Sequence, residues 1–225
     1  MYLQFQVPSS EEEWTKVSDE FCNRWNFPHC IGAMDGKHVT IKCHVNSGSN
    51  FYNYKNFFSI VLFAIVDADY KFLYVDVGKN GRISDGGIFV NTPIYKKLEA
   101  SSVGTPQPKH LHDRVKPVPY MIVGDDAFPI KTYLMKLYPS RNLDITQRIF
   151  NYRLSRVRRI VENVFGILSS RFVVFQKPIP LEPEKVEKVV LAACALHNFL
   201  RSKPSSRNIY SPPNIWIVKV VTMEA

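Results

Sequence analysis

The sequence predicts an α/β fold in which helices flank a mixed β-sheet. Three strand-like segments follow one another early in the chain, and a fourth short apolar segment lies later, between stretches with helical spacing. Consecutive strands favour antiparallel pairing, whereas a strand that follows a helix favours a parallel neighbour. Hydrophobic residues make up 45% of the 225 residues, so the chain can bury a core and global disorder is not expected.

The first element is expected to be a helix from about Ser10 to Asn26. Ser10 lies three residues before Glu13, which is the spacing of a capping box. Apolar residues then recur at helical intervals until Pro28 ends the helix.

An antiparallel meander of three strands is expected next. The segment CIGAMDGKHVTIKC alternates as a strand does, and its Asp35–Gly36 step is compatible with a turn or a bulge. SIVLFAIV is a nearly continuous apolar run, typical of a strand that is buried on both faces. A turn at Asp67–Asp69 leads to the third strand, KFLYVDVG.

The second half of the chain alternates between helices and one further strand. We expect a helix from Asp85 to Ala100, a basic proline-rich loop at 101–119, a short buried strand ending in Gly124-Asp125-Asp126, a helical turn after Pro129, a long helix at about 146–171 and a last helix at 184–201. The chain is therefore divided into an N-terminal helical extension at 1–26, one main domain at 27–201 and a tail without a clear pattern at 202–225.

The net charge of +9 and a sequence pI near 9.4 favour a polyanionic partner, of which nucleic acid is the commonest. The alternative is a soluble basic protein without such a partner. The four cysteines form no CxxC pair, which argues against both a disulfide framework and a zinc knuckle. The first residues lack a secretory signal, and the apolar stretches are too short to span a bilayer, so we expect a soluble intracellular protein.

Three acids stand where a sheet-based site would place them. Asp35 lies in or just after the first strand, Asp85 begins the helix after the third strand, and Asp125 ends the fourth. Carboxylates resist burial, and several gathered together repel one another. A divalent cation removes that conflict, so these three residues are candidate metal ligands.

Glu162 is a fourth candidate, and it allows two interpretations. Between residues 141 and 171 there are seven arginines, opposed only by Asp144 and Glu162. Glu162 is therefore either a metal ligand or the partner of Arg158 or Arg159 in an ion pair within the helix.

Phosphodiester cleavage is the chemistry that would use both the acids and the basic charge. Mg²⁺ and Mn²⁺ prefer oxygen ligands, and a pair of such ions activates the attacking water and stabilises the leaving oxygen. Arg158, Arg159 and Lys37 are candidates for contacts to phosphate, as is Lys79. Each is equally compatible with a solvated surface charge, and for Lys79 the surface charge is the favoured interpretation.

Several sequence blocks resemble, in order, those of PIF/Harbinger transposases and of the nucleases derived from them in host genomes. The blocks include GAMDGKHV, VDVGKNGRISDGGIF, VGDDAFPI and NYRLSRVRRIVENVFGILSSRF, within roughly Phe27 to Leu200. The resemblance implies that residues 27–201 form an RNase H-like nuclease domain of the DDE type that uses Mg²⁺ or Mn²⁺. It also implies site roles by position: Asp35, Asp125 and Glu162 would be catalytic, and Asp85 would join them as a metal ligand. Asp126 stands beside Asp125, so the choice between the two remains open.

Two functions are compatible with these features. The first is a metal-dependent endonuclease that hydrolyses DNA in the nucleus, with or without a cytoplasmic pool, and acts with a separate DNA-binding protein. The second is a domesticated, catalytically silent module that binds DNA or protein. The resemblance leads us to expect a long N-terminal helical region, of which this sequence carries one helix, and this favours the second function. A third interpretation, a basic protein with scattered acids, requires the four acids to lie apart in space.

Overall fold

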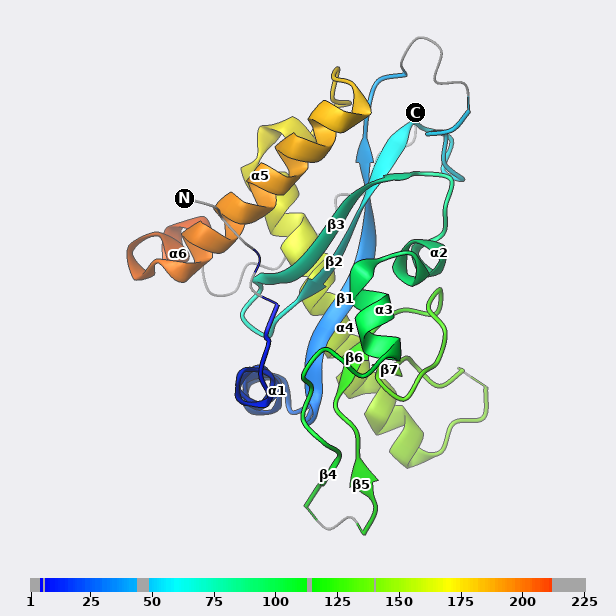
Figure 1. The fold of residues 1–225 in the computed structure, drawn as a ribbon, viewed down its shortest axis with the longest axis vertical. Coiled ribbons are helices and arrows are strands. Elements are labelled where there is room, and N and C mark those ends of the chain that lie inside the picture. The colour runs from blue at the N-terminus through cyan, green and yellow to red at the C-terminus, as the bar shows by residue number, and fades with distance from the viewer. Residues whose placement is uncertain (1–4, 6, 44–48, 113–114, 140, 212–225) are drawn as a thin grey trace.

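The structure, a computed structural model, describes residues 5, 7–43, 49–112, 115–139 and 141–211. A five-stranded mixed sheet forms its central layer, and helices cover both faces (Figure 1). The strands of this sheet are β1 (Cys30–Thr40), β2 (Ser59–Val66), β3 (Phe72–Asn80), β6 (Met121–Val123) and β7 (Leu134–Met135). The helices are α1 (Glu11–Trp25), α2 (Asp85–Val90), α3 (Pro93–Glu99), α4 (Ile145–Arg171), α5 (Pro183–Ser202) and α6 (Pro204–Tyr210), with a 3-10 turn at Val173–Phe175.

The strand order is β3-β2-β1-β6-β7. The β1–β2 and β2–β3 pairs are antiparallel, whereas β1–β6 and β6–β7 are parallel. This arrangement confirms the predicted RNase H-like sheet, in which a three-strand meander is extended by parallel strands. Asp35 and Gly36 continue β1 without a break, opposite Ala64 and Phe63, so their step is neither a turn nor a bulge in that pairing.

The second strand shows why the sheet is a middle layer. All eight of its residues are buried. Ile60, Leu62 and Ala64 belong to the core beneath α4 and α5, whereas Val61, Phe63 and Ile65 belong to the core beneath α2 and α3. Because side chains alternate between the faces of a strand, a continuous apolar run fits a strand covered on both sides.

The helices on the α4 side begin and end where local chemistry predicts. The hydroxyl of Ser10 accepts a hydrogen bond from the Glu13 amide and caps α1, and Asn26 ends that helix in the left-handed region. Asp144 and Gln147 form a reciprocal capping box at the start of α4. Both the first helix and the long helix are therefore confirmed.

The single helix predicted from Asp85 to Ala100 is wrong, because the chain forms two short helices there. Thr92 caps α3 by accepting a hydrogen bond from the Tyr95 amide, and Pro93 occupies the first helical position. Proline has no amide hydrogen and clashes with the preceding turn, so α2 cannot continue through it.

Two further differences lie near the edge of the sheet. The helical turn predicted after Pro129 is wrong: the chain instead forms β7, because the outer edge of β6 offers unpaired backbone groups that Leu134 and Met135 satisfy. The basic loop at 101–119 contains a small hairpin, β4 (Lys109–His110) and β5 (Pro117–Val118).

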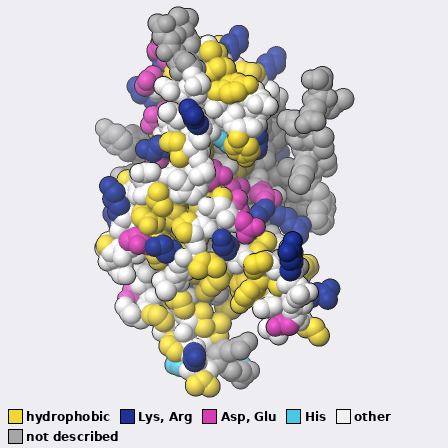
Figure 2. Space-filling model, turned by 90° about the vertical axis from the view of Figure 1, so that its right-hand side faces the viewer, with side chains coloured by type: hydrophobic (Ala, Val, Ile, Leu, Met, Phe, Trp, Pro, Cys, Tyr) yellow, Lys and Arg dark blue, Asp and Glu magenta, His cyan; other side chains and the backbone are white. Residues whose placement is uncertain are grey.

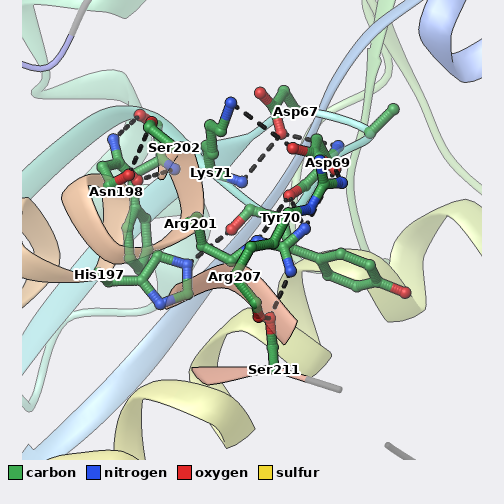
Figure 3. A network of polar contacts seen from close by, with 12 residues as sticks. Asp67, Asp69, Tyr70, Lys71, His197, Asn198, Arg201, Ser202, Arg207 and Ser211 are labelled. Carbon is green, nitrogen blue, oxygen red and sulfur yellow. Dashed lines mark hydrogen bonds and ion pairs between the residues drawn. The ribbon is translucent and has the colours of Figure 1, made fainter. Parts of the chain in front are cut away.

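A charged network fastens the C-terminal helices to the meander (Figure 3). Asp69, in the turn between β2 and β3, forms ion pairs with Arg24 of α1, Arg201 of α5 and Arg207 of α6. Burial alone would raise the pKa of Asp69, but the hydrogen bond from Arg24 and the charges of the other arginines lower it.

The predicted tail includes a helix, α6, while residues 212–225 of that tail lie outside the described residues. The domain boundaries stay predictions.

Candidate metal centre

Three carboxylates meet where β6 ends beside β1. Val123, the last residue of β6, pairs with Ala33, so β1 continues past it without this parallel neighbour. Asp35 lies on that continuation, Asp125 lies in the loop directly after β6, and Asp85 is the first residue of α2. Each of the three offers a carboxylate oxygen, and these oxygens all lie within 4.8 Å of one another.

Two glycines permit this close approach. A Cβ atom on Gly36 would lie 2.0 Å from Oδ1 of Asp85, so the Asp85 carboxylate occupies the space that a side chain at position 36 would fill. A Cβ atom on Gly86 would lie 2.3 Å from the carbonyl oxygen of Ala127. The Asp-Gly steps at Asp35 and Asp85 therefore let α2 reach both β1 and the loop that carries Asp125.

Local hydrogen bonds hold the carboxylates in place. Oδ1 of Asp35 accepts a hydrogen bond from the Gly36 amide at 2.8 Å, and Oδ1 of Asp125 accepts one from the Ala127 amide at 2.9 Å. Asp126 is exposed and does not belong to the three-carboxylate group. The geometry thus places Asp125 in the cluster, while its role as a ligand remains a prediction.

The carboxylates of the cluster repel one another, and the pKa values of Asp35 and Asp85 are raised. The pKa of Asp35 is raised to about 7, mainly by burial and with a contribution from the charges of Asp125, Asp85 and Glu162, against the hydrogen bond from the Gly36 amide. Burial also raises the pKa of Asp85, with a contribution from Asp125 that Lys55 opposes. The raised pKa values favour the protonated carboxyl groups in the metal-free cluster, and a cation would relieve the same repulsion.

Glu162 lies at the margin of this cluster and is paired with Arg158. The Arg158 guanidinium donates to the Glu162 carboxylate at 2.7 Å, so the ion pair within the helix is the interaction observed. The pKa of Arg158 is raised: burial opposes this, but the bond to Glu162 outweighs it, and Asp35 and Asp125 add to it. The structure thus brings three of the four predicted acids together, and it places the fourth within electrostatic reach.

Two of the predicted phosphate contacts, Arg158 and Lys37, lie within electrostatic reach of the acids. Lys37 is half-buried on β1, where burial and then the charge of Lys55 lower its pKa, against Asp35. Arg159 is exposed on α4. Figure 2 shows acidic side chains gathered near the middle of one face, with Lys and Arg side chains around them. The charge of Lys55 also acts on Asp85, although no periodic pattern in the sequence connects Lys55 to the acids.

The protein-family model described as "DDE superfamily endonuclease" matches residues 34–198, well over half of the chain. The chain belongs to the DDE endonuclease superfamily. The match includes all four predicted acids of this DDE domain. The resemblance to proteins derived from Harbinger transposases is confirmed by the curated relatives.

The DDE chain is 26% identical to "Protein ALP1-like" of Arabidopsis thaliana over 194 residues, which cover 83% of the chain and 48% of that relative. It is 24% identical to "Putative nuclease HARBI1" of Bos taurus over 209 residues, covering 92% of the chain and 55% of the relative. The human protein of that name is 23% identical over 211 residues, covering 92% and 56%. The chain therefore spans about half the length of the curated relatives it matches.

No solved structure gives a significant match to the chain. In the part of the chain that the structure describes, no helix combines the length and apolar character needed to cross a membrane.

Proposed function

We propose that this chain is a divalent-metal-dependent endonuclease domain that hydrolyses phosphodiester bonds in DNA. The observation that carries the proposal is the meeting of Asp35, Asp85 and Asp125, whose oxygens lie within 4.8 Å of one another in a chain with a net charge of +9. A catalytic acid cluster within a basic protein suits a polyanionic substrate, because the acids alone would repel it.

The donor set fits a hard cation such as Mg²⁺ or Mn²⁺. All three donors are carboxylate oxygens, and ligands about 2.1 Å from an octahedral ion lie roughly 3–4 Å apart. The oxygens of the cluster lie within 4.8 Å of one another, which is compatible with that spacing. The charges of Asp125 and Asp85 contribute to the raised pKa of Asp35, and a bound cation would offset this repulsion.

The residues of the chain would have different roles in this reaction. A bound divalent ion supplies Lewis acidity and lowers the pKa of a water bound to it. Asp35, Asp85 and Asp125 hold the ion, and Glu162, once it leaves Arg158, orients the attacking water or a DNA 3′-hydroxyl. Arg158, Arg159 and Lys37 neutralise the phosphates on either side of the scissile bond.

The second candidate function is a DNA- or protein-binding module without turnover. The pairing of Glu162 with Arg158 favours it, because a Glu162 that keeps this partner is not available to the cluster. In either case we infer a nuclear location and a separate DNA-binding protein as partner, which the resemblance and the net charge support.

The test combines metal binding with nicking of supercoiled plasmid DNA. Saturation with Mn²⁺ at about 100 times its dissociation constant is expected to stabilise the protein by about 2.7 kcal/mol, or roughly 5–10 °C. Asp125→Asn should lose both this stabilisation and the nicking. Asp126→Asn is the matched control, since it changes the exposed neighbouring acid, and it should retain both.

Equal nicking in Mn²⁺ and in EDTA, or full activity of Asp125→Asn, would refute the nuclease. Mn²⁺-dependent stabilisation without nicking, with or without an added DNA-binding partner, would support the silent module instead.

A further inference from the structure

The loop between β1 and β2 presents an exposed tyrosine and lysine beside the metal centre. Tyr54 is 77% exposed, and Nζ of Lys55 lies 5.4 Å from the centre of its ring. The rings of His38 and Tyr54 pack in a T-shaped arrangement, with 5.7 Å between the ring centres. An aromatic side chain that is held in place and still faces solvent is a preformed surface for stacking.

A buried polar network holds this pair. Asn53 is 3% exposed and Ser59 is fully buried, although both are polar. The Asn53 amide group donates to the Ser59 hydroxyl at 2.8 Å, and its oxygen accepts hydrogen bonds from the amides of Lys55 at 2.9 Å and of Phe57 at 3.3 Å. Because Ser59 is the first residue of β2, the loop that carries Tyr54 is anchored to the sheet.

His38 extends the same network into β1. Its Nδ1 lies 2.9 Å from the Ser59 hydroxyl, and it is two residues from Gly36, against which the Asp85 carboxylate lies. Side chains two residues apart on a strand share a face, so the His38 ring is on the same face of β1 as the Asp85 carboxylate that lies over Gly36. The network thus connects an exposed Tyr–Lys pair with the rim of the acid cluster.

We propose that Tyr54 and Lys55 bind the DNA strand next to the scissile phosphate, with Tyr54 stacked on an unpaired base and Lys55 in contact with a phosphate. This rests on the proposed function and specifies its substrate: DNA that is single-stranded or locally unpaired at the cleavage point. A paired base has both faces covered by its neighbours, whereas an unpaired base offers its face to an aromatic ring. A cation beside the acids also offsets their repulsion of the phosphate.

The experiment measures fluorescence anisotropy of a labelled single-stranded oligonucleotide and of its duplex, both in EDTA. Tyr54→Ala should weaken binding of the single strand about ten-fold or more and leave duplex binding nearly unchanged. Tyr54→Phe should bind as the wild type does. Lys55→Gln should reduce the slope of log affinity against log salt for the single strand by about 0.7, the loss of one phosphate contact.

Tyr152→Ala is the matched control. Tyr152 is 62% exposed and has the Arg156 guanidinium 5.9 Å from its ring centre, but it lies on α4, outside the Asn53 network. We expect it to change single-strand affinity less than two-fold. Both side chains are exposed, so unchanged melting temperatures will show that the variants are folded.

The inference is overturned if Tyr54→Ala binds the single strand as the wild type does, weakens both probes equally, or loses no more affinity than Tyr152→Ala. Absence of wild-type binding to the single strand also overturns it. Because binding is measured without metal, the proposed Tyr54–Lys55 contact and the proposed nuclease activity are tested separately. Single-strand affinity that depends on Tyr54, without nicking, supports only the contact. Nicking by a protein whose affinity is unchanged in Tyr54→Ala supports only the nuclease.

Discussion

Substitution of Asp35 by asparagine should stabilise the metal-free protein much more at alkaline pH than at pH 5. In the folded protein burial raises the pKa of Asp35 to about 7, whereas an unfolded chain has the ordinary value of 3.8. The stabilising effect of the proton on Asp35 is therefore complete below about pH 4 and is lost as the pH rises through 7. Above that pH the folded protein must hold a charge that its burial and its acidic neighbours oppose.

The size of this stability change follows from the difference between the folded and the unfolded pKa of Asp35. Each pH unit between 3.8 and about 7 corresponds to about 1.4 kcal/mol, so charging Asp35 costs on the order of 4 kcal/mol in the folded protein. Part of the side chain contacts solvent, which screens the charge, and we therefore expect roughly half of this, about 2 kcal/mol, to be measured.

The assay compares wild type and Asp35→Asn by thermal unfolding in EDTA at pH 5 and at pH 8.5. The variant should melt about 4–8 °C above the wild type at pH 8.5 and only about 1–3 °C above it at pH 5, because little more than a third of the interval from 3.8 to about 7 lies below pH 5. Using the difference between the two pH values removes any local packing effect of the amide, because that effect is the same at both. A variant whose melting temperature differs from the wild type by the same amount at both pH values would show that the cluster does not hold Asp35 protonated.

Three further predictions concern the residues that support the site and the fold. Gly36→Ala should weaken Mn²⁺ binding in calorimetry by about ten-fold, because its Cβ would lie 2.0 Å from the Asp85 carboxylate; unchanged affinity would mean that Asp85 is not a ligand. Asp69→Ala should cost about 3–5 kcal/mol in urea unfolding, because Arg201, only 5% exposed, loses its carboxylate partner. A loss below 1 kcal/mol would contradict that role. Asn53→Ala should cost about 1–3 kcal/mol by leaving the buried Ser59 hydroxyl and two loop amides without that partner, and a smaller loss would show that water replaces the side chain.

The sequence was most informative where local chemistry and periodicity agree. The capping residues of α1 and α4 and the unbroken apolar run of β2 depend on neighbours within a few positions, so their elements were predicted closely. The same local reasoning failed at the sheet edge. Whether residues 134–135 form a strand depends on the open edge of β6, which no pattern in that segment reveals.

Residue types and their order also determined which acids were candidates, because a carboxylate next to an apolar strand is costly without a partner. Only the tertiary structure decided that Asp35, Asp85 and Asp125 share one cluster, that Asp126 is outside it, and that Glu162 is held by Arg158. The physical reason is that a sequence records what each side chain is able to do. Distances between segments depend on where β6 ends and on how closely two glycines let α2 approach. Which cation pairs with a carboxylate depends in turn on these distances, so both are properties of the folded chain.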